Sequence, residues 1–370
     1  MKNKFILFGL IVAVVAIGVF FIFKNFSKNK VDVISGVTKN LDNEGVALND
    51  KINLISPEDT SEKRIELLKQ VDDFAKKSID GKGFSPEIYA LIKIRLDQAL
   101  KEIPQTQVPK GKIKIWYLYN MGVIVKSSEK TVAFDLAGTY VYSQMAEFAK
   151  FIDVLFITHF HNDHFDKNVV EQAIKSGATV AVPDEKVRVE DIGFIKDSNG
   201  ENIMDILSGH GSVNFNNLFI AIKPQEKTVI KGIEVVAYPA NHIGLGEDPA
   251  IAPFPLDWYE INLPGITLLH MGDGTSFDQK TNFINKNIDV FITHNMDPKT
   301  NDSLMKIVPN AKTILPLHIL ELGHGTDIIS SHTMDYQNLL DNYTDGYFKS
   351  SQGKEKNKFM PLIWGESVEF

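Results

Sequence analysis

The sequence predicts an α/β fold of two β-sheets faced by helices, preceded by a transmembrane helix and a helical hairpin. Three observations support this prediction. Residues 5–23 are all uncharged, residues 61–103 contain two apolar patterns with helical spacing, and from residue 111 onward short β-rich runs alternate with turns. Many strands with helices between them are typical of a layered α/β domain with a buried core.

Composition excludes several classes of protein before any motif is considered. The chain has 370 residues and an apolar fraction of 44%, as expected of one large domain with an appendage or of two ordinary domains. Its net charge of -8 offers no basic face for nucleic acid, so we expect no nucleic-acid partner. It contains no cysteine, which excludes disulfides and thiolate metal sites. The oligomeric state stays open.

Residues 1–30 are predicted to form an N-terminal membrane anchor. The uncharged run at 5–23 is close to the roughly 20 residues that a helix needs to cross a bilayer. A cleaved secretory signal is the alternative, but the run is long and no A-x-A-like site follows it before Lys24, Lys28 and Lys30. Lysines balance on the two sides of the run, so we take the default topology, in which the bulk of the chain is exported.

Two further segments precede the main domain. Residues 31–57 are polar, lack a clear period and are interpreted as a linker. Residues 58–110 are predicted to form a helical hairpin, because apolar residues recur at helical spacing over 61–78 and again over 88–103. We interpret the hairpin as a structural element packed on the main domain, with a substrate lid as the alternative.

Residues 111–370 are predicted to form the main domain, made of many short strands. A hairpin is expected where "SSEK" separates "GVIVKS" from "TVAFDL". Other strands are expected at "IKIWYLY", "VLFITH", "ATVAVP", "LFIAIK", "IEVVAYPANH", "WYEINL", "ITLLHMGD", "VFITH" and "TILPLH". Helices are expected near 167–176, 301–308 and 333–342. Polar residues gather at the strand ends, where sites tend to form.

The stretch "THFHNDHFD", residues 158–166, carries the strongest chemical signal. It packs His159, His161 and His164 around Asp163 and follows them with Asp166, although only 10 residues of the chain are histidine. The apolar run 151–157 before it has strand length, so the cluster lies where a buried strand ends and a loop begins. Loops at such positions commonly carry functional groups.

Three more strands end in residues that bind metals. "EVVAYPANH" ends at His242, "GITLLHMGD" ends at Asp273, and "AKTILPLH" ends at His318. The recurrence of metal-binding side chains at the ends of buried strands is the pattern expected of one site assembled at a common edge.

The order of these motifs resembles the metallo-β-lactamase superfamily. Within it, "IKIWYLYNMGVIVKSSEKTVAFDLA", "HMGDG" and "ILPLH" are most similar to the branch of ascorbate-6-phosphate lactonases and N-acylphosphatidylethanolamine-hydrolysing phospholipases D. The resemblance spans about residues 111–370. It implies an αββα sandwich holding two divalent metal ions.

The resemblance also implies which residues bind each ion. The first ion would be held by three imidazoles, the second by a carboxylate and two imidazoles, and one carboxylate would bridge them: His159, His161 and His242; Asp163, His164 and His318; and Asp273. Zinc is the expected metal, because zinc bound by three imidazoles lowers the pKa of a bound water to about 7. Nitrogen and carboxylate ligands also accept manganese or iron.

Other polar residues near these motifs are weaker candidates for the site. Asp135, at the end of "TVAFD", resembles the family's carboxylate that orients a metal histidine. Asp166 could act in the same way, or could cap the helix expected at 167–176. His294 and His324 could bind a substrate oxyanion or donate a proton, with a structural role as the alternative for each. His270 is expected to pack beside Asp273 rather than bind metal.

The expected function is that of a membrane-anchored dinuclear hydrolase. A hydroxide bridging the metals, close to Asp163, would attack an ester, lactone or phosphodiester of a small-molecule or lipid-like substrate. The competing hypothesis is a non-hydrolytic membrane-bound sensor that uses the metal site only to bind a ligand. None of the seven ligand positions is degenerate, which favours the enzyme.

Overall fold

A computed structural model describes residues 41–59, 61–77, 86–139, 141–161, 163–184, 219–242, 256–277, 286–294, 307–320, 336–342 and 358–370. Residues Leu41–Phe370 form one compact unit. The membrane span predicted at 5–23 lies outside the described residues, and within them no helix is both long and apolar enough to cross a membrane.

Three helices precede the sheets, α2 (Asn43–Leu54), α3 (Glu62–Lys77) and α4 (Pro86–Gln105). The two helices predicted over 61–78 and 88–103 are confirmed as α3 and α4. The linker predicted for 31–57 is wrong where α2 forms. Asp42 caps α2 by accepting a hydrogen bond from the Gly45 amide at 2.7 Å, and α2 packs on α3 and α4. Its buried edge is too narrow to give a clear apolar period, so tertiary packing rather than local pattern decides it.

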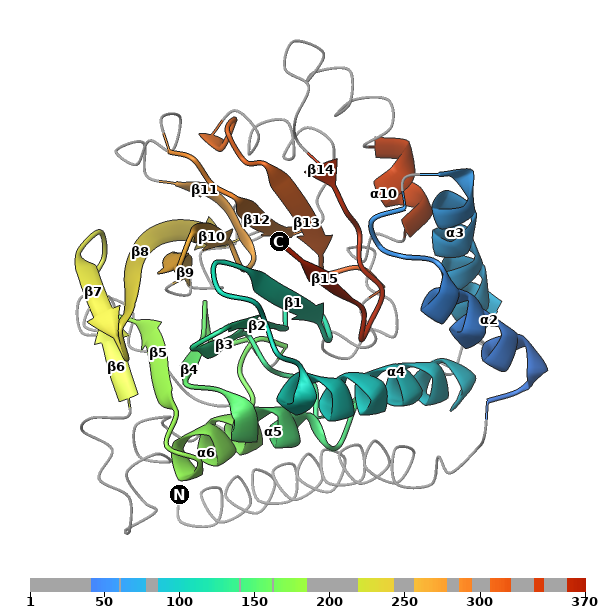
Figure 1. The fold of residues 1–370 in the computed structure, drawn as a ribbon, viewed down its shortest axis with the longest axis horizontal. Helices are drawn as coiled ribbons and strands as arrows, with labels where there is room; N and C mark the ends of the chain where they lie inside the picture. Colours follow the sequence, from blue (N-terminus) through green and yellow to red (C-terminus); the bar gives the residue numbers. More distant parts are fainter. Residues whose placement is uncertain are drawn as a thin grey trace, which may run out of the picture. The chain divides into compact units, whose positions relative to one another are not determined.

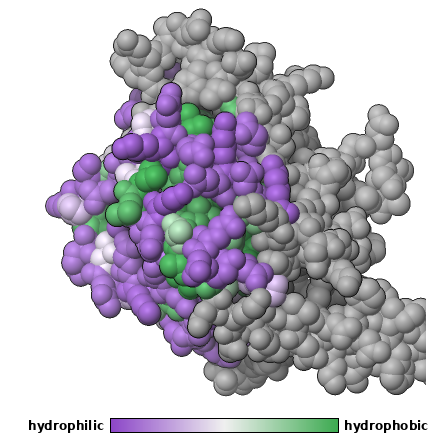
Figure 2. Space-filling view, turned by 90° about the vertical axis from the view of Figure 1, so that its right-hand side faces the viewer, coloured by the Kyte–Doolittle hydropathy of each residue, from purple (hydrophilic) through white to green (hydrophobic). Residues whose placement is uncertain are grey.

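The side of the molecule that carries α2, α3 and α10 (Tyr336–Asn342) is mostly hydrophilic where it is described, with separate small apolar areas (Figure 2). Val46 and Leu54 of α2 are exposed, with 46% and 83% of their surface open to solvent. Scattered apolar side chains of this kind are normal on a protein surface.

A buried ion pair joins the helices to the end of the chain. The Arg64 guanidinium in α3 donates to both carboxylate oxygens of Glu366, at 2.7 and 2.6 Å, and to the Pro361 carbonyl at 2.8 Å. Asp72, also in α3, accepts hydrogen bonds from the first two backbone amides of α10, at 2.9 and 2.5 Å. These bonds, and a core shared with the sheets, favour a structural role for the hairpin over that of a lid.

The first sheet consists of β1 (Ile113–Tyr117), β2 (Val123–Ser127), β3 (Thr131–Phe134), β4 (Val154–Phe156), β5 (Thr179–Pro183), β6 (Phe219–Ile222) and β15 (Ser367–Glu369). Their order is β15-β1-β2-β3-β4-β5-β6 (Figure 1). The β2–β3 hairpin turns as predicted, with the Ser127 hydroxyl accepting from the amides of Glu129 and Lys130 at 3.3 and 3.0 Å. From β3 to β6 the strands are parallel, so the ends of β3 and β4 lie at one edge.

The second sheet consists of β7 (Lys227–Ile230), β8 (Ile233–His242), β9 (Leu256–Leu263), β10 (Ile266–His270), β11 (Gly274–Phe277), β12 (Val290–His294), β13 (Thr313–Leu317) and β14 (Lys358–Phe359). Their order is β11-β8-β9-β10-β12-β13-β14, and β7 pairs with β8. β10, β12 and β13 are parallel and end at the same edge. Every residue of β12 and β13 is buried, as expected of central parallel strands.

The two sheets pack face to face. The ring of Tyr259 in β9 packs at a tilt against that of Phe156 in β4, with centroids 5.3 Å apart, and the Tyr259 hydroxyl donates to the Ile157 carbonyl at 3.0 Å. His270 of β10 stacks at 4.7 Å on Phe134 of β3. Helices α4, α5 (Met145–Phe148) and α6 (Lys167–Lys175) lie along the first sheet (Figure 1). This confirms the α/β sandwich. Of the helices expected at 301–308 and 333–342, most of the first lies outside the described residues, and the second is α10.

Candidate metal centre

Strand ends from both sheets meet at one site. β4 leads into the motif of residues 158–166, β10 leads to Asp273, and β13 leads to His318. β8 ends at His242, which pairs in register with Gly274, the residue after Asp273. The backbone of His242 is therefore next to the site, and its side chain lies outside the part of the chain that the structure describes.

Two groups of possible metal ligands share one carboxylate. Asp163, His164, Asp273 and His318 form one group, and His159, His161 and Asp273 form the other, with ligand atoms in each group within 4.8 Å of one another. Asp273 thus lies where a bridging ligand is expected. The six residues come from three separate segments of the chain.

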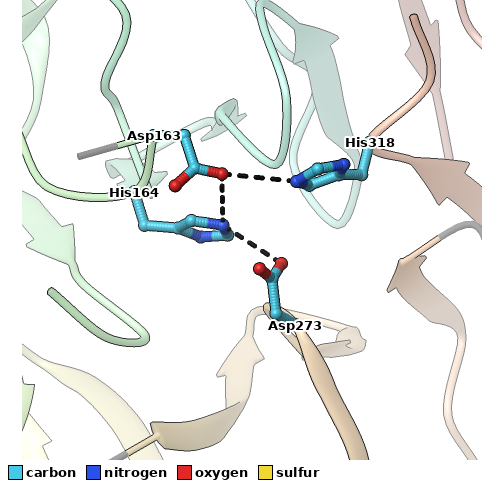
Figure 3. A group of neighbouring side chains, drawn as sticks. All are labelled: Asp163, His164, Asp273 and His318. Atoms are coloured by element: carbon cyan, nitrogen blue, oxygen red, sulfur yellow. Dashed lines mark hydrogen bonds and ion pairs between the residues drawn. The ribbon is translucent and has the colours of Figure 1, made fainter. Parts of the chain in front are cut away.

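The first four of these side chains converge on a small volume (Figure 3). The Asp163 Oδ2 atom lies 3.2 Å from His164 Nε2 and 3.3 Å from His318 Nε2, and Asp273 Oδ1 lies 3.0 Å from His164 Nε2. In the other group, His159 Nε2 is 3.7 Å from Asp273 Oδ2. His159 and His164 are fully buried, and Asp163 is 1% exposed.

Asp135 lies behind the site and orients His164. Its carboxylate accepts hydrogen bonds from the Thr158 amide at 2.8 Å, the Thr158 hydroxyl at 2.7 Å, and His164 Nδ1 at 2.9 Å. Because Nδ1 carries the proton in that bond, Nε2 is directed at Asp163 and Asp273. Asp135 adopts a positive φ of 45°, a strained region that asparagine and aspartate tolerate better than most residues.

The charges at the site shift two pKa values strongly. Burial alone would lower the pKa of His164, but the carboxylates of Asp273, Asp163 and Asp135 outweigh it and raise that pKa well above its usual range. Burial alone would raise the pKa of Asp163, but the charge of His164 and hydrogen bonds from His164 and His318 hold it well below its usual range. The centre therefore favours positive charge close to its carboxylates.

This arrangement fits bound cations. His164 Nε2 is buried and makes no hydrogen bond, yet it faces two carboxylate oxygens within 3.2 Å. When the ring is neutral with its proton on Nδ1, all three atoms present lone pairs to one another, which is unfavourable unless a proton or a metal cation lies between them. Imidazole nitrogens and carboxylate oxygens suit zinc, manganese or iron.

The structure assigns two of the weaker candidates to structural roles. Asp166 caps α6, accepting from the amides of Asn168 and Val169 at 2.9 and 3.5 Å. His270, as expected, packs in the core rather than joining either ligand group. Its Nε2 lies 3.0 Å from the Met121 carbonyl, its Nδ1 accepts from an amide at 3.1 Å, and burial lowers its pKa.

His294 comes closer to the centre than its sequence position alone indicates. Its ring centroid lies 4.2 Å from that of His318, and its Nε2 lies 3.9 Å from Asp273 Oδ1. His294 ends β12, and β12 is parallel to β13, so the two histidines emerge side by side from the same sheet edge. His324 lies outside the described residues.

Asn120 is a site residue that the sequence interpretation missed. It lies between β1 and β2, is fully buried, and donates from Nδ2 to Asp163 Oδ2 at 3.2 Å. The available signal was an asparagine in "YNMG", a short polar interruption between two apolar strands. Such a signal usually means a turn, so it could not point to the metal centre.

With this geometry established, comparison with known proteins identifies the family. Residues 114–318, more than half of the chain, match the family described as a beta-lactamase superfamily domain. The chain belongs to the metallo-β-lactamase superfamily. This superfamily is dependent on divalent metals, in agreement with the two ligand groups. No curated protein matches the chain.

Several solved structures resemble the structure of this chain. A metallo hydrolase from the archaeon Ignicoccus hospitalis is 16% identical, with a TM-score of 0.47, covering 70% of this chain and 98% of that one. An isothiocyanate hydrolase from Delia radicum gut bacteria is 15% identical, with a TM-score of 0.46, covering 69% and 98%. CmlA, a diiron β-hydroxylase from Streptomyces venezuelae, is 14% identical, with a TM-score of 0.47, covering 71% and 54%.

Proposed function

We propose that this protein is a dinuclear metal-dependent hydrolase that acts on an ester, lactone or phosphodiester. The observation that carries the proposal is the position of Asp273, which belongs to both groups of ligand atoms. Two ions sharing a carboxylate would supply a hydroxide nucleophile at neutral pH and polarise the scissile bond. Zinc is the first choice of metal, with manganese and iron as alternatives.

Individual residues of the chain would have separate roles in this reaction. Asp163 would orient the attacking oxygen beside the second ion, and Asp135 keeps His164 in the tautomer that can bind a metal. His294 is a candidate to bind the substrate oxyanion or to protonate the leaving group, because it lies beside His318 and near Asp273. No nucleophile from the protein is required.

The substrate class rests on the sequence motifs. The similarity of "HMGDG" and "ILPLH" to lactonases and lipid phosphodiesterases supports an ester, lactone or phosphodiester, including lipid-like molecules. The acidic balance of the chain does not favour a nuclease.

The decisive experiment measures metal-dependent turnover and metal content together. The full-length chain, stripped with chelator and reloaded with zinc, manganese or iron, is assayed on a panel of phosphodiesters, lactones and esters. We expect turnover only after reloading, with two ions bound per chain. Asp163→Asn should lose the second ion and most of the turnover while staying folded, because a neutral amide is a poorer ligand for a hard cation.

A matched control is Asp153→Asn. Asp153 is also a carboxylate beside β4, and it accepts the Thr131 amide at 2.9 Å, but it lies before the strand rather than at its functional end. It should keep both ions. Turnover that survives in Asp163→Asn after the second ion is lost would disprove the two-metal mechanism. Ligand binding without turnover by any metal form would instead favour the sensor hypothesis.

We also propose that residues 5–23 anchor the protein in a membrane, with the catalytic domain on the exported side and a lipid-like substrate within reach. The support is the uncharged apolar length of that segment. The full chain should stay with membranes through an alkaline carbonate wash, and deletion of residues 1–30 should release folded protein. Recovery of a soluble wild-type chain shortened at its N-terminus would identify a cleaved signal instead.

A further inference from the structure

We propose that Asn120 is a positioning residue that sets the geometry of the second metal site by holding Asp163 through its side chain and His318 through its backbone. The inference rests on the dinuclear centre of the proposed function. It assigns a role to a residue that is not itself one of the grouped ligands.

The side chain of Asn120 fixes the Asp163 carboxylate. Its Nδ2 donates to Asp163 Oδ2 at 3.2 Å, and the same oxygen lies 3.2 Å from His164 Nε2 and 3.3 Å from His318 Nε2. Asn120 is fully buried, so water does not compete for this bond. A neutral donor at this place restrains the carboxylate without adding a charge that would repel a cation.

The backbone of Asn120 fixes the other ligand. The His318 amide donates to the Asn120 carbonyl at 3.0 Å, which ties the end of β13 in the second sheet to the β1–β2 turn in the first. One residue therefore contacts two ligands that are 155 positions apart in the sequence. His318 itself has a φ of 62°, so its backbone is held in a conformation that it would rarely adopt unaided.

The turn around Asn120 is well braced. The Leu118 amide donates to the Gly122 carbonyl at 2.9 Å, and the Gly122 amide donates to the Tyr119 carbonyl at 2.7 Å. A Cβ on Gly122 would lie 2.8 Å from the Tyr119 carbonyl and 3.0 Å from that of Asp135, so the turn packs tightly against the backbone that follows β3. A support of this kind can transmit a fixed geometry to the ligands.

The identity of residue 120 also has a physical reason. Its φ is 48°, in the left-handed region that glycine, asparagine and aspartate tolerate. Glycine would allow the turn but offer no donor, and aspartate would place another carboxylate against Asp163. Asparagine alone of the three combines the backbone conformation with a neutral donor.

The test compares metal affinity in wild type, Asn120→Gly and Asn120→Ser, all in the full-length chain, by titrating zinc and cobalt(II) against a competing chelator. Asn120→Gly keeps the left-handed turn and the carbonyl that accepts from His318, and removes only the amide. We expect roughly 10–100-fold weaker binding of the second ion, with the first ion unaffected. The cobalt(II) spectrum of the second site should change as well.

Two controls separate positioning from folding. Asn120→Ser also removes the donor, because its hydroxyl is too short to reach Asp163, but it strains the turn at a φ of 48° where glycine relaxes it. An equal loss of second-ion affinity in both variants would assign the effect to the missing donor rather than to the turn. Gln225→Gly alters an exposed residue with a φ of 61° and should leave both affinities unchanged. The thermal unfolding temperature of the metal-free protein, prepared with chelator, reports on folding separately and should change little in Asn120→Gly.

The outcomes also separate this inference from the proposed function. A wild-type chain that binds fewer than two ions would overturn the dinuclear proposal and this inference with it. A wild type that binds two ions, together with glycine and serine variants that bind both equally well, would overturn the role of Asn120 alone. A loss of stability in the chelated variants with both affinities kept would show that Asn120 serves folding only.

Discussion

Two buried polar clusters in the described part of the chain differ in how their charges are balanced. The helix junction, which we define as Arg64, Asp72, Arg95 and Glu366, contains two cations and two anions. The metal centre gathers three carboxylates, Asp135, Asp163 and Asp273, around imidazole rings. Both clusters lie in the interior, and both join segments that are far apart in the sequence.

At the helix junction the chain itself supplies the donors. Glu366 accepts two bonds from Arg64 and a third from the Ile363 amide at 2.8 Å, and Asp72 accepts two amides of α10. Arg95 donates to the Trp364 carbonyl at 3.1 Å; burial lowers its pKa, while nearby Glu366 acts in the opposite direction. A buried charge is costly unless it is paired, and here the fold provides the partner.

At the metal centre the chain supplies more acceptors than donors. His164 donates a hydrogen bond from Nδ1 to Asp135. Its Nε2 therefore carries no proton to donate to Asp163 and Asp273 unless the ring is charged. The comparison shows that burial of polar groups has two different purposes in this protein. The helix junction holds the fold together, whereas the metal centre is left to be completed by cations.

The largest effect is expected from breaking the helix junction. Arg64→Met leaves Glu366 buried without its cation, so the free energy of unfolding should fall by about 3–5 kcal/mol. Denaturant unfolding of the chelated protein measures this change. Metal stoichiometry in the fraction that stays folded should still be two, because Arg64 contacts no residue of the metal centre in the part of the chain that the structure describes.

Surface charge provides the control for this prediction. Lys93 pairs with Asp97 at 2.6 Å on α4, with 51% of the lysine side chain exposed, and Lys93→Met should cost at most about 1 kcal/mol. The double variant Arg64→Met with Glu366→Leu should recover most of the loss, since it removes both buried charges. Equal costs for Arg64→Met and Lys93→Met would show that the junction is not the stabilising element described above.

The same comparison explains what the sequence could predict. Most of the candidate metal ligands could be predicted from the sequence. Four of them are close together in the chain, namely His159, His161, Asp163 and His164, and the ends of predicted strands indicate where Asp273 and His318 lie. Helices α3 and α4 could be predicted from their own apolar periods. These are local signals, which one sequence displays directly.

Long-range contacts could not be predicted from the sequence in this way. Arg64 and Glu366 are 302 positions apart, and neither residue has a local pattern that names its partner. Asn120 looks like an ordinary turn residue until the His318 amide is found on its carbonyl. α2 has too narrow a buried edge to show a period, and its helix depends on α3 and α4 being in place. Each miss is a case in which tertiary context decides the role of the residue.

The smallest effect on folding and a selective effect on metal are expected from Asp135→Asn. The asparagine oxygen can still accept the Thr158 amide, so the strand end should stay in place. Its amide nitrogen, however, would face His164 Nδ1 as a donor. The ring would then accept at Nδ1 and carry its proton on Nε2, the atom that faces Asp163 and Asp273. A protonated Nε2 cannot bind a metal.

We therefore expect second-metal affinity to fall roughly 10–100-fold in Asp135→Asn, while the free energy of unfolding of the chelated protein changes by less than about 1 kcal/mol. Chelator competition and denaturant unfolding measure the two quantities on the same preparation. NMR of histidine labelled with nitrogen-15 reports the tautomer directly and should show the proton of His164 moved from Nδ1 to Nε2. A variant that keeps the Nδ1 tautomer and full affinity would mean that Asp135 does not orient the ligand. A variant that unfolds before it loses metal would place Asp135 with the helix junction, as a group buried for stability.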